Sequence, residues 1–140
     1  MKRFCICLLA ALAVVPLVGC GSSGNSTVTG TITTTDGQVV TGGRITFTSV
    51  SPPVSASSRI APDGTYELSS VEPGDGAPVG NYQVAIVSKI SSVGGDRNGR
   101  SVATSKSLVH EKYADIETSE LTAQVAPGSN TINFEVDPPK

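Results

Sequence analysis

Apolar and polar residues follow two different patterns along this chain, and each pattern predicts a different kind of segment. The first is a run of apolar residues over positions 4–18, broken by one proline and preceded by the basic pair Lys2-Arg3. A run of about fifteen residues matches the apolar core of a signal peptide and falls short of the about twenty that a membrane-spanning helix needs. We therefore expect residues 1–19 to direct export and then to be removed.

Beyond residue 26 the apolar residues recur at every second position, which is the pattern of a half-buried β-strand. No window of a dozen residues without Gly or Pro has the helical spacing i, i+3, i+4 and i+7. Turn signals such as Asp36-Gly37 and Asp63-Gly64 separate the alternating segments. The alternating residues are Val28 and Ile32; Ile45 and Phe47; Tyr66 and Leu68; Tyr82, Val84 and Ile86; Leu121 and Val125; and Ile132, Phe134 and Val136. About seven short strands predict an all-β fold, an antiparallel seven-stranded β-sandwich, with a closed barrel as the alternative.

Composition divides the chain after the export signal into a tether, a domain and a loop. Residues 20–26 are rich in Gly, Ser and Asn, which cannot bury enough surface to become ordered, so we expect a flexible tether. The β-sandwich domain is predicted over residues 27–137. Within it, residues 91–107 hold three glycines, several charges and little apolar surface, and we expect a long, irregular and mobile loop there. The more apolar segment 108–113 should dock against the domain.

The export signal ends in Leu17, Val18, Gly19 and Cys20, and these four residues resemble the bacterial lipobox. The resemblance implies that the Cys20 thiol is linked to diacylglycerol, with acyl chains such as palmitate, and that the chain is then cut before Cys20. An ordinary secretory signal cut near Gly19 is the alternative. Two or more acyl chains anchor a protein stably, so we expect attachment to a membrane through Cys20. Gly21 stands where an Asp would resemble an inner-membrane retention signal, which favours the outer membrane of the cell envelope.

Charge and cysteine content restrict the partners that we expect. Loss of residues 1–19 removes two of the ten basic residues, leaving eight against 12 acidic residues and a net charge of −4. Nucleic acids and anionic surfaces need basic patches, so we expect neither as a partner. The same loss removes two of the three cysteines and lipidation would consume the third, so no disulfide, Cys nucleophile or Cys metal site is expected. The remaining 121 residues suffice for one domain, which we expect to be a monomer without metal or cofactor.

A set of glycines, aromatic residues and turn residues recurs at regular intervals between positions 27 and 90. The set is Val28, Gly30 and Ile32; Asp36-Gly37; Ile45 and Phe47; Asp63-Gly64, Tyr66 and Leu68; and Gly80, Tyr82, Val84 and Ile86. It resembles the carboxypeptidase regulatory-like domain, which implies a transthyretin-like β-sandwich without catalytic activity. The segment 108–113, together with Leu121, Val125, Asn130 and Phe134, resembles a subgroup of small planctomycete lipoproteins in which Pro often replaces His110.

The inventory of reactive side chains argues against an enzyme. His110 is the one histidine, no Gly-x-Ser-x-Gly elbow is present, and a zinc site needs more His or Cys ligands than remain. The run Asp96-Arg97-Asn98-Gly99 lacks the spacing and the bidentate Glu of a calcium loop. The acidic residues Glu111, Asp115, Glu117 and Glu120 are interpreted as a solvated face. There is no Trp, and Tyr66 and Tyr82 fall on the apolar faces of their strands, so we expect them in the core.

We therefore predict a non-enzymatic, lipid-anchored envelope protein with a structural or protein-interaction role. The alternative is a module that binds carbohydrate or another small solute, and exposed aromatic rings would favour it. The expected partner is an envelope protein or a glycan. The sequence by itself assigns no residue to ligand binding.

Overall fold

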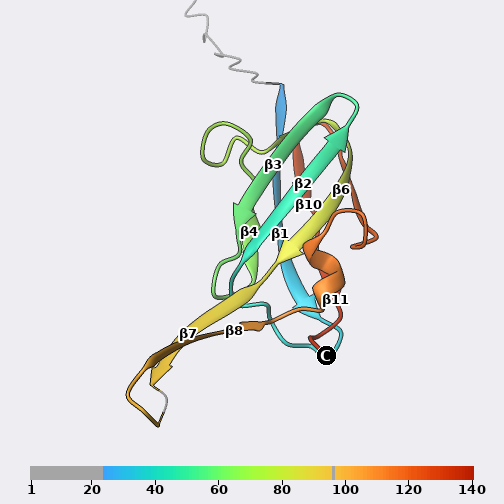
Figure 1. Cartoon of the computed structure of the whole chain (residues 1–140). Coiled ribbons are helices and arrows are strands. Elements are labelled where there is room, and N and C mark those ends of the chain that lie inside the picture. Colours follow the sequence, from blue (N-terminus) through green and yellow to red (C-terminus); the bar gives the residue numbers. More distant parts are fainter. Residues whose placement is uncertain (1–23, 96) are drawn as a thin grey trace, which may run out of the picture.

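The computed structural model of the chain describes residues 24–95 and 97–140, and in this part every regular element except one is a β-strand (Figure 1). The exception is a short 3-10 helix, η1 (Glu111–Ala114). The prediction of an all-β fold is confirmed. The lipobox residues Leu17, Val18, Gly19 and Cys20 lie outside the described residues. No helix in the part that the structure describes is long and apolar enough to cross a membrane.

The first sheet is organised around β1 (Asn25–Thr34), the longest of the described strands. It pairs antiparallel with β4 (Thr65–Glu67) and β5 (Ala77–Pro78), and parallel with β10 (Ser129–Thr131) and β11 (Phe134–Val136). The predicted antiparallel arrangement was therefore wrong for this sheet, because the last strands run in the same direction as β1. Every second residue of β1 is buried, including Val28 and Ile32, as the period-two pattern predicts. The threonines between them face outwards.

The second sheet is antiparallel, in the order β3 (Pro53–Arg59), β2 (Arg44–Val50), β6 (Gly80–Val87) and β9 (Leu121–Val125). Its register places Phe47 of β2 between Ala56 of β3 and Val84 of β6, and all three are buried. Neighbouring positions such as Thr48 and Gln83 lie on the opposite face. This alternation of apolar and polar positions is typical of an antiparallel sheet with one face in water.

Phe47 lies at the centre of a cluster of aromatic rings that joins the two sheets. Its side chain is fully buried. The centroid of its ring lies 6.3 Å from that of Tyr66 and 5.9 Å from that of Phe134, both in the first sheet, and 5.9 Å from that of Tyr82 in its own sheet. The two sheets therefore face each other across one hydrophobic core.

Tyr66 and Tyr82 are buried, as predicted, and each hydroxyl group reaches a backbone carbonyl. Tyr66 donates to the carbonyl of Ile132 at 2.6 Å, and Tyr82 donates to that of Pro78 at 2.8 Å. Burial raises the pKa of both phenols. Neither ring is a platform for stacking a ligand.

Gly30 allows the last strands to approach β1 closely. A Cβ atom at this position would lie 1.8 Å from the carbonyl oxygen of Ile132, which no side chain permits. The backbone N–H of Ile132 donates to the carbonyl of Thr29 at 2.8 Å. The close approach of Ile132 to Gly30 is therefore part of the parallel pairing of the last strands with β1. Only glycine fits here, because the neighbour is backbone and cannot move aside.

The segment predicted as an irregular loop over residues 91–107 is instead a β-hairpin. β7 (Lys89–Gly95) and β8 (Ser101–Ser107) pair antiparallel from Lys89 opposite Ser107 to Gly95 opposite Ser101. The prediction of an irregular loop was wrong because backbone pairing orders this segment without burying apolar side chains. Gly99, with φ 76°, lies in the turn between the strands.

The start of the domain and the number of strands also differ from the predicted ones. The tether was expected to extend to residue 26, but Asn25 and Ser26 already pair with Pro78 and Ala77 as the start of β1. The structure has eleven strands rather than about seven in the described residues. The difference comes from the hairpin, the strand β3, which none of the alternating segments covers, the two-residue strand β5 and the division of the last strand into β10 and β11.

Candidate functional site

The β7–β8 hairpin extends away from the two sheets, at the lower left of the view (Figure 1). All seven residues of β7 and six of the seven in β8 are exposed to solvent. Within the described residues each strand pairs only with the other, so each has one edge without a neighbouring strand. Such an edge presents a row of backbone N–H and C=O groups to solvent.

Apolar side chains lie on both faces of this hairpin. Val93 is 75% exposed, Ile90 is 52% exposed and Val102 is 47% exposed. Val93 lies opposite Ala103 on one face, and Ile90 and Val102 lie on the other. The hairpin thus exposes apolar surface that the core does not use.

The hairpin is also the basic part of the chain. Residues 89–107 hold four basic residues and one acidic residue, a net charge of +3. Residues 20–88 and 108–140, which we call the body, together hold four basic and eleven acidic residues, a net charge of −7. An acidic body therefore carries a basic projection. Lys89 and Lys106 stand at its base, and Arg97 and Arg100 near its tip.

Two serines fasten the hairpin to the body. Ser88 is buried, and its hydroxyl donates to the carbonyl of Gly42. Its own carbonyl accepts from the backbone N–H of Leu108 at 2.8 Å. The hydroxyl of Ser107 lies 2.6 Å from the carbonyl of Val109 and 3.3 Å from that of Ser88. The base of the hairpin is therefore held in place where it leaves the body.

The segment after the hairpin docks as predicted. Val109 and Tyr113 are buried, and Leu108 packs against the core. His110 lies between them with intermediate exposure, where its backbone N–H donates to the carbonyl of Asp137 at 2.9 Å. Its Nδ1 atom accepts from the backbone N–H of Lys112 at 3.2 Å, which caps η1. His110 has a structural role there.

A small hollow of about 290 Å³ lies beside His110, at the base of the hairpin. It is lined by Ile86, Val87, Ser88, Lys89, Ser107, Val109, His110, Glu111 and Ala114. No second imidazole or thiol is among these residues. In residues 24–95 and 97–140, no three His, Cys, Asp or Glu side chains are grouped so that they could hold a metal ion. The acidic residues Glu111, Asp115, Glu117 and Glu120 are thus not brought together as a metal site.

The aspartates of the predicted turns have structural roles. The hydroxyl of Thr34 donates to Asp36, and Asp63 Oδ1 accepts from the backbone N–H of Thr65 at 3.0 Å and from its hydroxyl at 2.6 Å. These hydrogen bonds from Thr34 and Thr65 lower the pKa of the two carboxyl groups. Residue 96, the first of the calcium-like run, lies outside the described residues.

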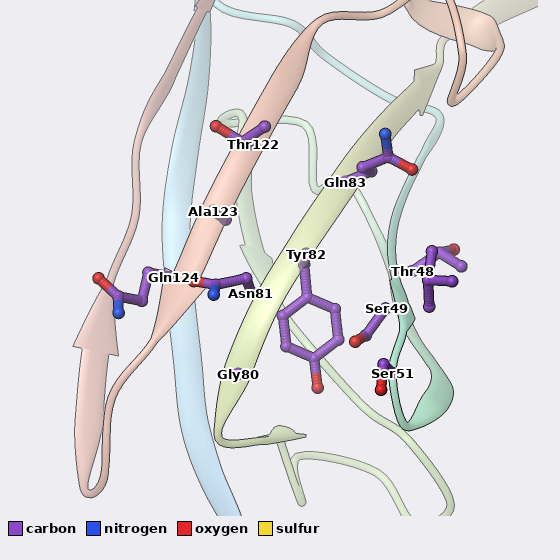
Figure 2. Close-up of a pocket in the computed structure, with 11 residues that line it drawn as sticks. Thr48, Ser49, Ser51, Gly80, Asn81, Tyr82, Gln83, Thr122, Ala123 and Gln124 are labelled. Atoms are coloured by element: carbon purple, nitrogen blue, oxygen red, sulfur yellow. The ribbon is translucent and has the colours of Figure 1, made fainter.

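A second candidate site is an open hollow of about 660 Å³ on the second sheet, near its β3–β2 turn and the start of β6 (Figure 2). The outward side chains around it are amides and hydroxyls, together with Val50 at the edge. Gln83 pairs with Thr48 of β2 on one side and Thr122 of β9 on the other. Asn81 lies opposite Gln124, and Figure 2 shows these two amides beside each other. None of the residues lining this hollow is charged.

Sequence reasoning missed both sites. Asn81 and Gln83 alternate with the core residues Tyr82 and Val84, so their outward direction was predictable, but their grouping with β9 depends on strand order. The hairpin gave no alternating signal on either side of its glycine-containing turn. Its two strands hold few apolar residues, and these do not recur at every second position.

Comparison with known proteins assigns no family. No protein-family model matches the chain, and no curated protein is similar to it. Among solved structures, a 9R-lipoxygenase from Cyanothece PCC8801 is similar with a TM-score of 0.37 and 10% sequence identity. The match covers 91% of this chain and 18% of that one, so the chain spans less than a fifth of the lipoxygenase. A similarity this weak supports no conclusion about the activity of this chain.

Proposed function

We propose that this chain is a non-enzymatic lipoprotein of the bacterial cell envelope, anchored through Cys20. In this proposal its domain is a β-sandwich of the carboxypeptidase regulatory-like type. The β7–β8 hairpin binds an extended segment of another envelope protein by adding it as a strand. The observation that carries the proposal is the projecting hairpin, which has two open edges and exposed apolar side chains.

A hairpin without further neighbouring strands has low stability in water. Two strands alone are at best marginally stable, and a third strand or a packed face is needed for independent stability. Here only the base is fastened, through Ser88 and Ser107, while the strands themselves contact solvent on both faces. A third strand would complete the backbone hydrogen bonds and cover Val93 or Val102. Strand addition is a common mode of peptide recognition by exposed edges.

Charge favours a partner other than a second copy. Two hairpins of net charge +3 repel each other if their edges pair. A strand added to the edge of β7 with an acidic side chain facing Lys89, or to the edge of β8 with one facing Lys106, would be attracted instead, because opposite charges in cross-strand pairs are stabilising. The partner that fits is therefore an extended, acidic segment that also carries apolar residues.

The position of the hairpin suits an anchored protein. β1 begins at Asn25, five positions after Cys20, and its ten residues span about 33 Å. In Figure 1 the hairpin leaves the body near the end of β1 that is opposite Asn25. A lipid at Cys20 would hold the other end of the domain near the membrane, so the hairpin would point away from it.

Two features support the fold assignment within the proposal. Gly30, which belongs to the set that resembles the regulatory-like domain, is required by the approach of Ile132. Phe47, Tyr66 and Tyr82 of the same set meet in one core between two facing sheets. The non-enzymatic assignment is supported by His110, whose Nδ1 caps η1.

Site-specific cross-linking in isolated envelopes tests this function. In the proposal Cys20 is lipidated, so Val93→Cys introduces a single free thiol, which can be labelled with a photoactivatable benzophenone. The matched control is Val71→Cys, since Val71 is 89% exposed and lies outside the hairpin. We expect one major adduct with another protein from position 93 and little from position 71.

Charge reversal then tests the mode of binding. Lys89→Glu combined with Lys106→Glu should lower the adduct yield about fivefold, since each reversed surface charge weakens the contact. The control is Arg59→Glu on β3, compared with Lys106→Glu as a single change of equal charge, and it should leave the yield unchanged. Equal adducts from positions 71 and 93, or an adduct that contains only a second copy of this chain, would contradict the proposal.

A further inference from the structure

The hollow of the second sheet gathers polar side chains whose hydrogen-bonding groups the protein leaves unused. Asn81, Gln83 and Gln124 are exposed, and none of these three amides has a side-chain hydrogen bond to another described residue. Two other amides of the domain are used: Asn130 bonds to Ala126 and Thr27, and Asn133 accepts from Thr31. The amides of the hollow are therefore available to a ligand.

The register of the strands gives these groups a regular arrangement. Thr48, Gln83 and Thr122 form one row across β2, β6 and β9, with neighbouring strands about 4.8 Å apart. Asn81 and Gln124 form a second row, displaced by two residues, or about 6.7 Å, along the strands. Each amide offers two N–H donors and a carbonyl acceptor, and each threonine hydroxyl both donates and accepts. The surface thus presents donors and acceptors in alternation.

The chemistry of the lining selects a class of ligand. With no charged side chain in the hollow, neither an anion nor a cation is favoured there. A neutral ligand with many hydroxyl groups can satisfy amide and hydroxyl groups together, because each sugar hydroxyl also both donates and accepts. Val50, which is 78% exposed at the edge of the hollow, can contact the apolar face of a sugar ring.

We propose that this hollow on β2, β6 and β9 is a binding site for a neutral oligosaccharide. Recognition comes from Asn81, Gln83 and Gln124 rather than from aromatic stacking, since Tyr82 is buried beneath the sheet. Binding without a stacked ring is weak, with a Kd of about 1 mM, or about −4 kcal/mol. The hollow is separate from the hairpin, so this site and the proposed protein contact can act independently.

Saturation-transfer difference NMR with the full lipidated chain in nanodiscs tests the site, since the method detects weak ligands and needs no sugar-based detergent. The probe is cellotetraose, and the charged comparison is tetragalacturonate. We expect saturation of the cellotetraose ring protons and none of tetragalacturonate. Gln83→Ala and Gln124→Ala should each weaken cellotetraose binding about three- to tenfold, as expected for one lost hydrogen bond.

Gln38→Ala is the matched control, because Gln38 is also an exposed amide without a side-chain hydrogen bond to the described residues, but lies outside the hollow. It should leave binding unchanged. If cellotetraose shows no saturation, or if Gln38→Ala weakens it as much as Gln83→Ala, the proposal is overturned. Equal saturation of both tetrasaccharides would likewise show that the hollow does not select a neutral ligand.

Discussion

Tyr113 and Asp137 are joined by two hydrogen bonds that use the same phenol oxygen. The hydroxyl of Tyr113 donates to Asp137 Oδ2 at 3.0 Å and accepts from the backbone N–H of Asp137, also at 3.0 Å. Lys112 adds an ion pair to the same Oδ2 atom at 2.6 Å. These contacts connect η1 to the chain just after β11, and so join the segment following the hairpin to the first sheet.

Tyr113→Phe should lower the free energy of unfolding by about 1–3 kcal/mol, because it leaves the backbone N–H of Asp137 without its acceptor and removes a donor to the carboxylate. Urea denaturation measures this change. Tyr82→Phe is the control, since it removes one hydrogen bond rather than two and should cost about 1 kcal/mol. A smaller loss for Tyr113→Phe than for Tyr82→Phe would show that the two bonds contribute little.

Thermal stability should fall as the pH drops below about 4. The pKa of Asp75 is lowered from 3.8 by hydrogen bonds from the backbone N–H groups of Ser70, Glu72 and Val71. The pKa of Asp137 is lowered from 3.8 by a hydrogen bond from Lys112 and, more weakly, by one from Tyr113. Depressed pKa values in the folded state stabilise it above the unfolded pKa, and this stability is lost as the pH falls through the folded pKa. The midpoint of thermal unfolding, measured between pH 2 and 7, reports this fall.

Asp75→Asn should make that acid-side fall shallower and lower the midpoint at pH 7. Asp75 Oδ1 accepts from Ser70 N at 2.6 Å, so the charged form is the one that the loop stabilises. Glu135→Gln is the control, because Glu135 is exposed and has no side-chain hydrogen bond to the described residues. An Asp75→Asn curve parallel to that of the unchanged protein would argue against this origin.

Removal of the hairpin should leave the body folded. Lys89 and Ser107 are Cα partners, so replacing residues 90–106 by Asn-Gly would connect them through a two-residue turn. No described residue of this segment belongs to the core, and the contacts of Ser88 and Ser107 remain. Near-ultraviolet circular dichroism should therefore keep its tyrosine signal. Loss of the tyrosine signal would show that the hairpin contributes to folding.

Cys20→Ser should abolish lipidation, because the thiol that accepts diacylglycerol is absent. Metabolic labelling with radioactive palmitate measures this directly. A variant that is labelled as strongly as the unchanged protein would refute the anchor. Loss of label together with release of the chain from the membrane fraction is the expected result.

The sequence by itself determined the strand pattern of the body. Val28, Phe47 and Val84 lie at alternating apolar positions, and all three are buried, because a strand that covers a core must direct its apolar side chains to one face. The aspartates of Asp36-Gly37 and Asp63-Gly64 likewise act in turns, since their hydrogen bonds are local. These features depend only on neighbours along the chain.

Tertiary structure decided the candidate sites. The row of Thr48, Gln83 and Thr122 exists because three strands distant in sequence become neighbours, and no local pattern encodes that order. The hairpin was mistaken for an irregular loop because its order comes from backbone pairing, which leaves no periodic apolar signal. The bonds between Tyr113 and Asp137 join residues 24 positions apart. Contacts of this kind form only when the whole chain folds, because the entropy lost in closing each loop is offset by the burial of the shared core.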